Sequence, residues 1–179
     1  MDKMTKTKEI YLAGGCFWGT EHYFKQIEGV VNTEVGFANG HTENPTYQEV
    51  YTDTTGFVET VHIQYNPEVV GLAFLLQMFF KAIDPTSLNK QGHDEGTRYR
   101  TGIYYTNPED LPIIEKVYQE EQKHYQHLDV VAYFHQLEYP VPEAVHAVAE
   151  EAEIAEQQVC RQYEQTRHQH SAVKYIAFL

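Results

Sequence analysis

Hydrophobic and polar residues alternate in several short stretches of this chain, and elsewhere the hydrophobic residues recur every three or four positions. Alternation is typical of strands with one buried face, whereas recurrence at three and four is typical of helices. Strands are therefore expected at residues 9–13, 30–37, 58–65, 101–106 and 130–134. Helices are expected at residues 17–27 and 69–83, as one turn at 46–51, and as about 18 residues that begin at the cap Asn107-Pro108-Glu109-Asp110.

The order of these elements through Thr106 is β-α-β-β-α-β. This order is typical of the ferredoxin-like split βαβ arrangement, a sheet with helices on one face. We therefore expect an α/β (α+β) fold, a two-layer sandwich with an added helix and strand. The chain has 179 residues, no internal repeat and no flexible linker, so residues 1–179 are expected to form a single domain. Residues 86–100 form a long polar loop, and loops of this length are usually functional or disordered.

The last third of the chain differs in composition, because residues 142–168 are rich in Ala, Glu and Gln. Its apolar residues recur at spacings of three and four along one stripe: Val141, Val145, Val148, Ala152, Ala155, Val159 and Tyr163. That stripe predicts a long amphipathic helix at residues 140–169. Such a helix usually packs on its own domain, and a partner-binding helix is the alternative.

The formal net charge of -13 limits what the protein can bind. Binding to nucleic acids and to anionic membranes depends on Lys and Arg residues, so neither partner is expected. Residues 1–9 are polar and Lys-rich, and no apolar signal sequence follows them. The most apolar stretch, residues 71–83, is shorter than the about 20 residues of a membrane span. We expect a cytoplasmic monomer.

Two cysteines are too few for a secreted disulfide scaffold, and in a reducing compartment both thiols are free for chemistry. Cys16 follows a predicted strand and a Gly-Gly turn, and it lies at the first turn of a predicted helix. Unpaired N–H groups and the positive end of that helix stabilise a thiolate, which is the reactive form. This position predicts a nucleophile, although a buried structural cysteine fits the same pattern.

The segment around this cysteine, Gly14-Gly15-Cys16-Phe17-Trp18-Gly19, resembles the signature of the methionine sulfoxide reductase A family. Further matching motifs follow in the same order and spacing: Asn44-Pro45-Thr46-Tyr47, Thr55-Gly56-Phe57-Val58-Glu59 and Gln91-Gly92-His93-Asp94-Glu95-Gly96-Thr97-Arg98-Tyr99-Arg100. The resemblance extends to about residue 130, and residues 9–135 are the expected catalytic core. It implies an enzyme that reduces methionine sulfoxide in proteins and peptides to methionine, acting on the S epimer at sulfur.

The resemblance implies chemical roles for two residues. Cys16 attacks the sulfoxide sulfur and becomes a sulfenic acid, while Glu59 protonates the sulfoxide oxygen. The pattern of strand 58–65 supports this role, because Glu59 belongs to its otherwise apolar set and burial raises the pKa of a carboxyl group. By position alone, Glu59 could equally face water at the end of its strand.

Five further residues match substrate-binding positions of the family: Phe17, Trp18, Tyr47, Asp94 and Tyr99. The resemblance implies that the first two rings receive the methyl end of the substrate, that the tyrosines hold its oxygen, and that Asp94 orders water or holds the substrate. No metal or organic cofactor is implied, and the ten histidines have no recognisable ligand spacing. Thioredoxin or another dithiol is the implied reductant and partner.

The resemblance fails near the C-terminus. Family members commonly carry a recycling cysteine in a Gly-rich tail after a Tyr-His-Gln element, and neither is found here. The cysteine of this region is Cys160, with Glu156 and Glu164 one turn away on the predicted helix. A disulfide with Cys16 needs Cα atoms about 4.4–6.8 Å apart, so a cysteine on a firm helix must already be adjacent or the helix must unwind. Cys160 is a candidate resolving thiol, and a single-cysteine enzyme regenerated by an external thiol is the alternative.

Two functions of other classes stay open on the sequence. A non-catalytic protein could keep the pocket and bind a partner through the C-terminal helix. A different thiol enzyme, such as a peroxidase or a cysteine hydrolase, could use the same cysteine, and the hydrolase would need a histidine base.

Overall fold

The computed structural model describes residues 7–42, 45–125 and 127–137 of the chain. Its strands are β1 (Lys8–Ala13), β2 (Val30–Ala38), β3 (Val58–Tyr65), β4 (Lys90–Gln91), β5 (Asp94–Glu95), β6 (Gly102–Tyr105) and β7 (Tyr133–Gln136). Its α-helices are α1 (Phe17–Phe24), α2 (Tyr47–Tyr51), α3 (Leu72–Ala82) and α4 (Leu111–Gln122), and its 3₁₀ turns are η1 (Thr97–Tyr99) and η2 (Pro108–Asp110).

Five of the strands form one sheet in the order β2-β3-β1-β6-β7. β1 pairs antiparallel with both β3 and β6, β2 pairs antiparallel with β3, and β7 pairs parallel with β6. The first four strands in this order have the neighbours and directions of the expected split βαβ arrangement. β7 is the added strand, and it lies at the edge beside β6.

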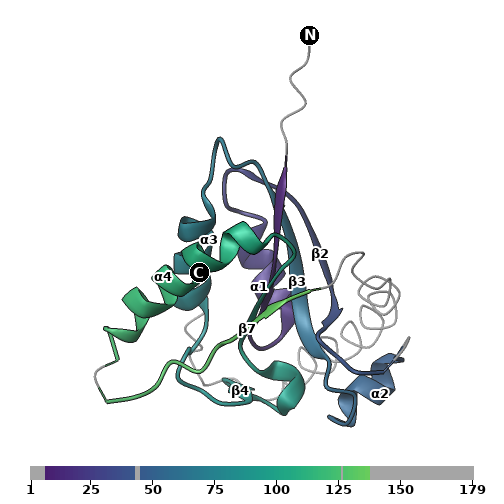
Figure 1. Cartoon of the computed structure of the whole chain (residues 1–179). Helices are drawn as coiled ribbons and strands as arrows, with labels where there is room; N and C mark the ends of the chain where they lie inside the picture. The colour runs from purple at the N-terminus through teal and green to yellow at the C-terminus, as the bar shows by residue number, and fades with distance from the viewer. Residues whose placement is uncertain (1–6, 43–44, 126, 138–179) are drawn as a thin grey trace, which may run out of the picture.

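Helices α1, α3 and α4 pack on one face of this sheet, and Figure 1 shows α3 and α4 side by side. The main core lies between these helices and the sheet. Because strand side chains alternate between faces, the same strands also bury a smaller cluster on the opposite face. Its members are Tyr11, Ala13, Ala38, Val58 and Tyr104.

Helix α3 illustrates how the sequence pattern produces this layer. Its buried residues recur at spacings of three and four, so they share one side of the helix: Leu72, Leu75, Leu76, Phe79 and Phe80. The helix ends at Ala82, and the chain is already extended at Ile83. This is the expected end, because Asp84 precedes Pro85 and a residue before proline resists the helical conformation.

The predicted boundaries of three helices were wrong by several residues. α1 ends at Phe24 instead of residue 27, because the chain turns there towards Gly29, whose φ of 98° no helix residue adopts. α3 begins at Leu72 instead of residue 69, because the N–H groups of Val69 and Val70 both donate to the carbonyl of Asn66 in a turn. α4 has 12 residues instead of about 18, since η2 forms the turn before it.

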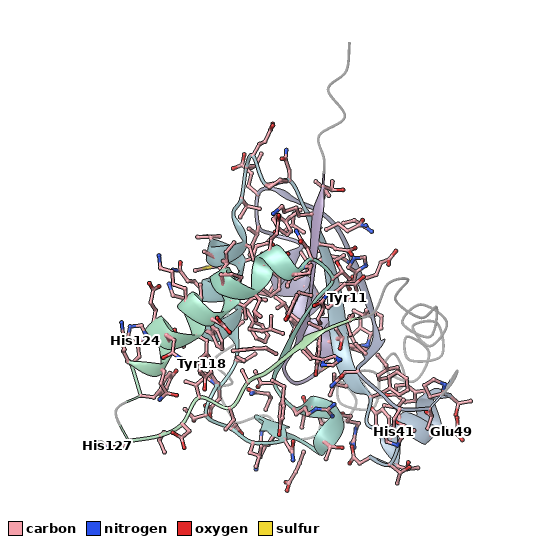
Figure 2. The ribbon with its side chains drawn as sticks, viewed as in Figure 1. Tyr11, His41, Glu49, Tyr118, His124 and His127 are labelled. Carbon is pink, nitrogen blue, oxygen red and sulfur yellow. The ribbon has the colours of Figure 1, made fainter. Side chains whose placement is uncertain are left out.

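The last strand and the long polar loop also differ from expectation. β7 begins at Tyr133 instead of residue 130, because the N–H of Val130 donates to the side chain of Gln122 (2.9 Å) and the N–H of Val131 donates to Pro85 (2.7 Å). Tyr118 of α4, labelled in Figure 2, donates its hydroxyl to the carbonyl of Val130 at 2.8 Å. Within residues 86–100, β4 and β5 form a hairpin and η1 follows it, so this loop is largely ordered by its own hydrogen bonds.

Two expectations fall outside the described residues, namely the amphipathic helix at residues 140–169 and the position of Cys160. Within the part of the chain that the structure describes, no helix combines the length and the apolar character needed to cross a membrane.

The packing of helices on the sheet predicts a large loss of stability when Leu75 is truncated, because its side chain is fully buried (0% exposed). We expect Leu75→Ala to lower the free energy of unfolding by about 2–5 kcal/mol, through lost burial and the cavity left behind. Leu88→Ala is the matched control, because Leu88 is 60% exposed and its loss should cost less than about 0.5 kcal/mol. Urea unfolding measures both, and equal losses would contradict the described core.

Candidate active site

Cys16 is the N-cap of α1, directly after β1 and the Gly14-Gly15 turn, as the sequence predicts. It is half-buried, and its backbone is extended, with φ -60° and ψ 121°. The N–H of Thr20 donates to the carbonyl of Cys16 (3.4 Å), and the hydroxyl of Thr20 reaches the same oxygen. The cysteine therefore lies at the positive end of the helix, where a thiolate is stabilised.

The two glycines before Cys16 let the chain turn where there is no room for side chains. A Cβ atom on Gly14 would lie 2.9 Å from the side chain of Ile83. Gly15 has a φ of 75°, and a Cβ atom there would lie 2.7 Å from the Cβ of Gln91. The N–H of Gly15 donates to the carbonyl of Tyr99 at 3.2 Å. The turn is thus tied to the segment that carries Tyr99.

Glu59 reaches the same helix end from β3. The antiparallel pairing of β1 with β3 aligns Leu12 with Val61, and the same register continued brings the Gly14-Gly15 turn level with Glu59. The side chain is buried (2% exposed), and its Oε2 accepts a hydrogen bond of 3.1 Å from the N–H of Phe17. Because Phe17 is the first residue of α1, this bond satisfies one of the helix N–H groups that have no partner within the helix. The carboxyl group and the thiol therefore lie at one helix end.

Aromatic rings line this helix end. The rings of Phe17 and Trp18 meet edge to face with centres 5.4 Å apart, and the ring of Phe17 lies 5.7 Å from that of Phe37. Phe37 is the cross-strand partner of Glu59, and its ring lies 6.1 Å from that of Tyr47. The rings form an apolar wall between α1 and α2, of the kind that receives a methyl group.

Three tyrosine hydroxyls lie in a row beyond this wall. The hydroxyl of Tyr47 donates to that of Tyr51, which lies 3.4 Å from the hydroxyl of Tyr99. Burial and the Tyr47 hydroxyl raise the pKa of Tyr51 well above its ordinary value, while burial and the Tyr51 hydroxyl do the same to the pKa of Tyr99. The charge of Glu59 raises the pKa of both tyrosines further. The phenols of Tyr51 and Tyr99 thus keep their protons near neutral pH and can donate them in hydrogen bonds.

The short helix α2 presents two of these tyrosines on one side, because residues four apart in a helix share a face. A capping box fixes its start: the side chain of Thr46 accepts from the N–H of Glu49, and the carboxylate of Glu49 accepts from the N–H of Thr46 at 2.8 Å. Figure 2 shows Glu49 and His41 at the corner of the molecule that α2 forms.

Asp94 lies beside the glycine turn, in the hairpin of β4 and β5. It is half-buried and pairs with Gln91 across the hairpin. Gln91 packs against Gly15, and its amide group exchanges hydrogen bonds of 2.8 and 2.7 Å with the backbone of Asp84. The hairpin is therefore fixed against the turn that precedes Cys16. Among the residues described, no group of three or more His, Cys, Asp or Glu side chains could hold a metal ion.

The structure brings most of the predicted site residues together. Four of them meet at the start of α1: Cys16, Phe17, Trp18 and Glu59. The row of hydroxyls beside them contains Tyr47 and Tyr99, and the neighbouring hairpin contains Asp94. The sequence patterns did not single out Tyr51, or the ion pair of Arg98 with Asp53 (2.9 Å) that lies beside the tyrosines. Tyr51 could have been found from its spacing of four after Tyr47 in a predicted helical turn, whereas no local sequence pattern joins Asp53 to Arg98.

Comparisons with known proteins show the family of the chain. A model of the peptide methionine sulfoxide reductase family matches residues 8–175. The peptide methionine sulfoxide reductase MsrA of Clostridium acetobutylicum is 53% identical over 118 residues, which are 66% of this chain and 73% of that protein. The MsrA of Lachnoclostridium phytofermentans is 54% identical over 118 residues, which are 66% of this chain and 71% of that protein.

Solved structures give the same result. The crystal structure of Mxr1 from Saccharomyces cerevisiae in reduced form has a TM-score of 0.68 and 35% identity, with 76% of this chain and 78% of that chain covered. The methionine sulfoxide reductase A of Corynebacterium diphtheriae has a TM-score of 0.67 and 34% identity, with 80% and 70% covered. The chain therefore belongs to the peptide methionine sulfoxide reductase family.

The geometry of the Gly14-Gly15 turn predicts that a side chain at position 15 destabilises the fold. We expect Gly15→Ala to lower the free energy of unfolding by about 1–3 kcal/mol, because a side chain is strained at a positive φ and would collide with Gln91. Gly19→Ala is the matched control, since Gly19 lies within α1 with nothing within 4 Å of an added Cβ. That variant should gain about 0.5–1 kcal/mol. Urea unfolding measures both, and a Gly15→Ala protein as stable as the wild type would refute the strain.

Proposed function

We propose that this protein reduces methionine sulfoxide in peptides and proteins to methionine, with Cys16 as nucleophile and Glu59 as proton donor. Membership of the family supports the activity. The observation that carries the assignment of residues is the hydrogen bond from the N–H of Phe17 to the buried carboxyl group of Glu59, because it holds an acid next to the helix end that bears the thiol.

A sulfoxide is a poor electrophile until its oxygen gains a proton, so reduction needs a thiolate and an acid together. The helix end supports the thiolate of Cys16. Two effects act on Glu59: its burial (2% exposed) disfavours the charged form of the carboxyl group, whereas the N–H of Phe17 favours it. The proposed role as the acid rests on the burial.

The proposed reaction transfers one oxygen atom. The Cys16 thiolate attacks the sulfoxide sulfur while Glu59 gives a proton to the sulfoxide oxygen. The attack forms a bond between Cys16 Sγ and the substrate sulfur. This sulfur–sulfur bond and the sulfur–oxygen bond of the substrate then break as the protonated oxygen passes to Cys16, methionine leaves as a thioether, and Cys16 is left as a sulfenic acid. The sulfoxide is reduced by two electrons, and the cysteine is oxidised by two.

The surrounding residues are proposed to bind and orient the substrate. Phe17 and Trp18 receive its methyl end, which agrees with their place in the apolar wall. Tyr99 donates a hydrogen bond to the sulfoxide oxygen, which agrees with its raised pKa, since that phenol keeps its proton. Tyr47 has one proton to donate, so its hydroxyl turns from Tyr51 to the same oxygen when the substrate binds. Asp94 orders water or holds the substrate from the neighbouring hairpin. The S epimer at sulfur is the proposed substrate.

The second half of the cycle returns Cys16 to a thiol. A second thiol condenses with the sulfenic acid, water leaves, and a dithiol reductant cleaves the resulting disulfide by exchange. Thioredoxin is the proposed reductant. Mxr1 of yeast, solved in complex with Trx2, supports this choice, with 28% identity and a TM-score of 0.51. The cycle needs no metal or organic cofactor, and its proposed site is the cytoplasm, where thiols are kept reduced.

Glu59→Gln tests the proton donor, because it keeps the shape of the side chain and removes the acid. We expect the rate of sulfenic acid formation to fall about a hundredfold or more, the usual contribution of a general acid. The rate is measured in a single turnover with a methionine sulfoxide peptide, with Cys16→Ser as the inactive reference. Glu34→Gln is the control, since Glu34 lies on β2 with its carboxylate 3.5 Å from His62. An unchanged rate in Glu59→Gln would remove Glu59 as the acid.

Cys160→Ser tests the resolving thiol. If Cys160 resolves the sulfenic acid, steady-state turnover with thioredoxin should fall at least about tenfold, because the intramolecular disulfide that thioredoxin reduces no longer forms. The first turnover, measured by methionine release without reductant, should keep its rate. A thioredoxin-driven rate equal to that of the wild type would contradict the resolving role and support regeneration of Cys16 by an external thiol.

A further inference from the structure

Tyr51 lies between the two tyrosines that the proposed function assigns to the sulfoxide oxygen. Its hydroxyl accepts from that of Tyr47 and lies 3.4 Å from that of Tyr99. The rings of Tyr47 and Tyr51 pack with centres 4.3 Å apart on one side of α2. Tyr47 belongs to α2 and Tyr99 to η1, so the hydroxyl of Tyr51 joins two donors that come from separate segments of the chain.

The ring of Tyr51 is fixed by Arg98. The guanidinium group of Arg98 lies over the ring of Tyr51 at 4.3 Å and over the ring of Tyr99 at 4.5 Å. A cation over an aromatic face is attracted by the charge distribution of the ring. One guanidinium group therefore holds both phenols, and it does so from η1, the segment that also carries Tyr99.

Asp53 in turn fixes Arg98. Its carboxylate accepts from Arg98 Nη1 at 2.9 Å, from the N–H of Arg98 at 3.1 Å and from the hydroxyl of Thr97 at 3.1 Å. Asp53 follows Tyr51 by two residues, and its φ of 58° turns the chain sharply after α2. The end of α2 is thereby bound to η1 through a charge-assisted hydrogen bond, which is stronger than one between neutral groups.

Core packing gives little reason for this arrangement. The side chain of Tyr51 is 38% exposed, whereas the core aromatic residues Phe79 and Tyr65 are at most 1% exposed. Its hydroxyl lies against the hydroxyls of Tyr47 and Tyr99, and its ring lies against the guanidinium group of Arg98. The contacts that define its position are thus contacts with the site.

We propose that Tyr51 is a positioning residue of the sulfoxide-oxygen site, which fixes the hydroxyls of Tyr47 and Tyr99 relative to each other and is itself held by Arg98 and Asp53. This inference rests on the proposed function. When both hydroxyl oxygens are held in place before the reaction, only their protons have to turn, so the alignment acts on the transition state more than on substrate binding.

The test is Tyr51→Phe, which keeps the ring and its contact with Arg98 and removes the hydroxyl. With a methionine sulfoxide peptide and dithiothreitol, we expect kcat to fall about tenfold while KM changes less than about twofold. Arg98→Met, which removes the stacked cation, should give the same selective fall in kcat. Tyr133→Phe is the control and should match the wild type, since Tyr133 lies on β7, is 52% exposed and contacts Arg100 at 6.0 Å.

The outcomes separate this inference from the function on which it rests. If the wild type reduces the sulfoxide and Tyr51→Phe has the same kcat, Tyr51 does not position the site and the inference is overturned. If Tyr51→Phe lowers only the midpoint of urea unfolding, its hydroxyl serves stability alone and the inference is likewise overturned. If the wild type itself fails to reduce the sulfoxide, the proposed function is overturned, and the inference that rests on it is overturned with it.

Discussion

The hydrogen bond between the N–H of Phe17 and the carboxyl group of Glu59 joins the start of α1 to the beginning of β3 at 3.1 Å. A carboxyl group that is 2% exposed is costly to bury unless it has hydrogen-bond partners, and a helix start has N–H groups without partners. The hydrogen bond therefore satisfies both the buried carboxyl group and a helix N–H group. Because Cys16 is the N-cap of α1, the bond that stabilises the buried acid also fixes the cysteine beside it. Apolar residues such as Phe17 and Phe24 pack the helix on the sheet, and this one contact fixes the acid relative to the thiol.

The rest of the site is assembled by contacts between segments far apart in the chain. The N–H of Gly15 bonds to the carbonyl of Tyr99, Gln91 fills the space that Gly15 leaves, and Asp53 binds Arg98 across 45 residues. These contacts lie near the end of the sheet at which β1 ends and β3 begins. The helices α1, α3 and α4, which pack on one face of the sheet, support these contacts.

Much of the fold followed from hydrophobic patterning, since the five strands of the sheet were all expected and β3 has the predicted bounds. The errors lie where side chains or turns compete with the pattern. The apolar residue Val130 has strand character, but its N–H is taken by Gln122, so β7 starts later. The site residues that could be predicted stand in contiguous motifs, such as Cys16 after its glycines. Arg98 and Asp53 could not be predicted, because their contact exists only once α2 and η1 are folded together.

The transfer of oxygen from the substrate to Cys16 is the step that the site is proposed to perform. It can be followed directly with a methionine sulfoxide peptide that carries a heavy isotope of oxygen, in one turnover without reductant, quenched in acid and analysed by peptide mass spectrometry. The Cys160→Ser protein is used so that no second thiol of the chain removes the oxygen. The proposed chemistry predicts one heavy oxygen atom on the peptide that contains Cys16. Methionine formed with no heavy oxygen on that peptide, or with the label on another residue, would contradict it.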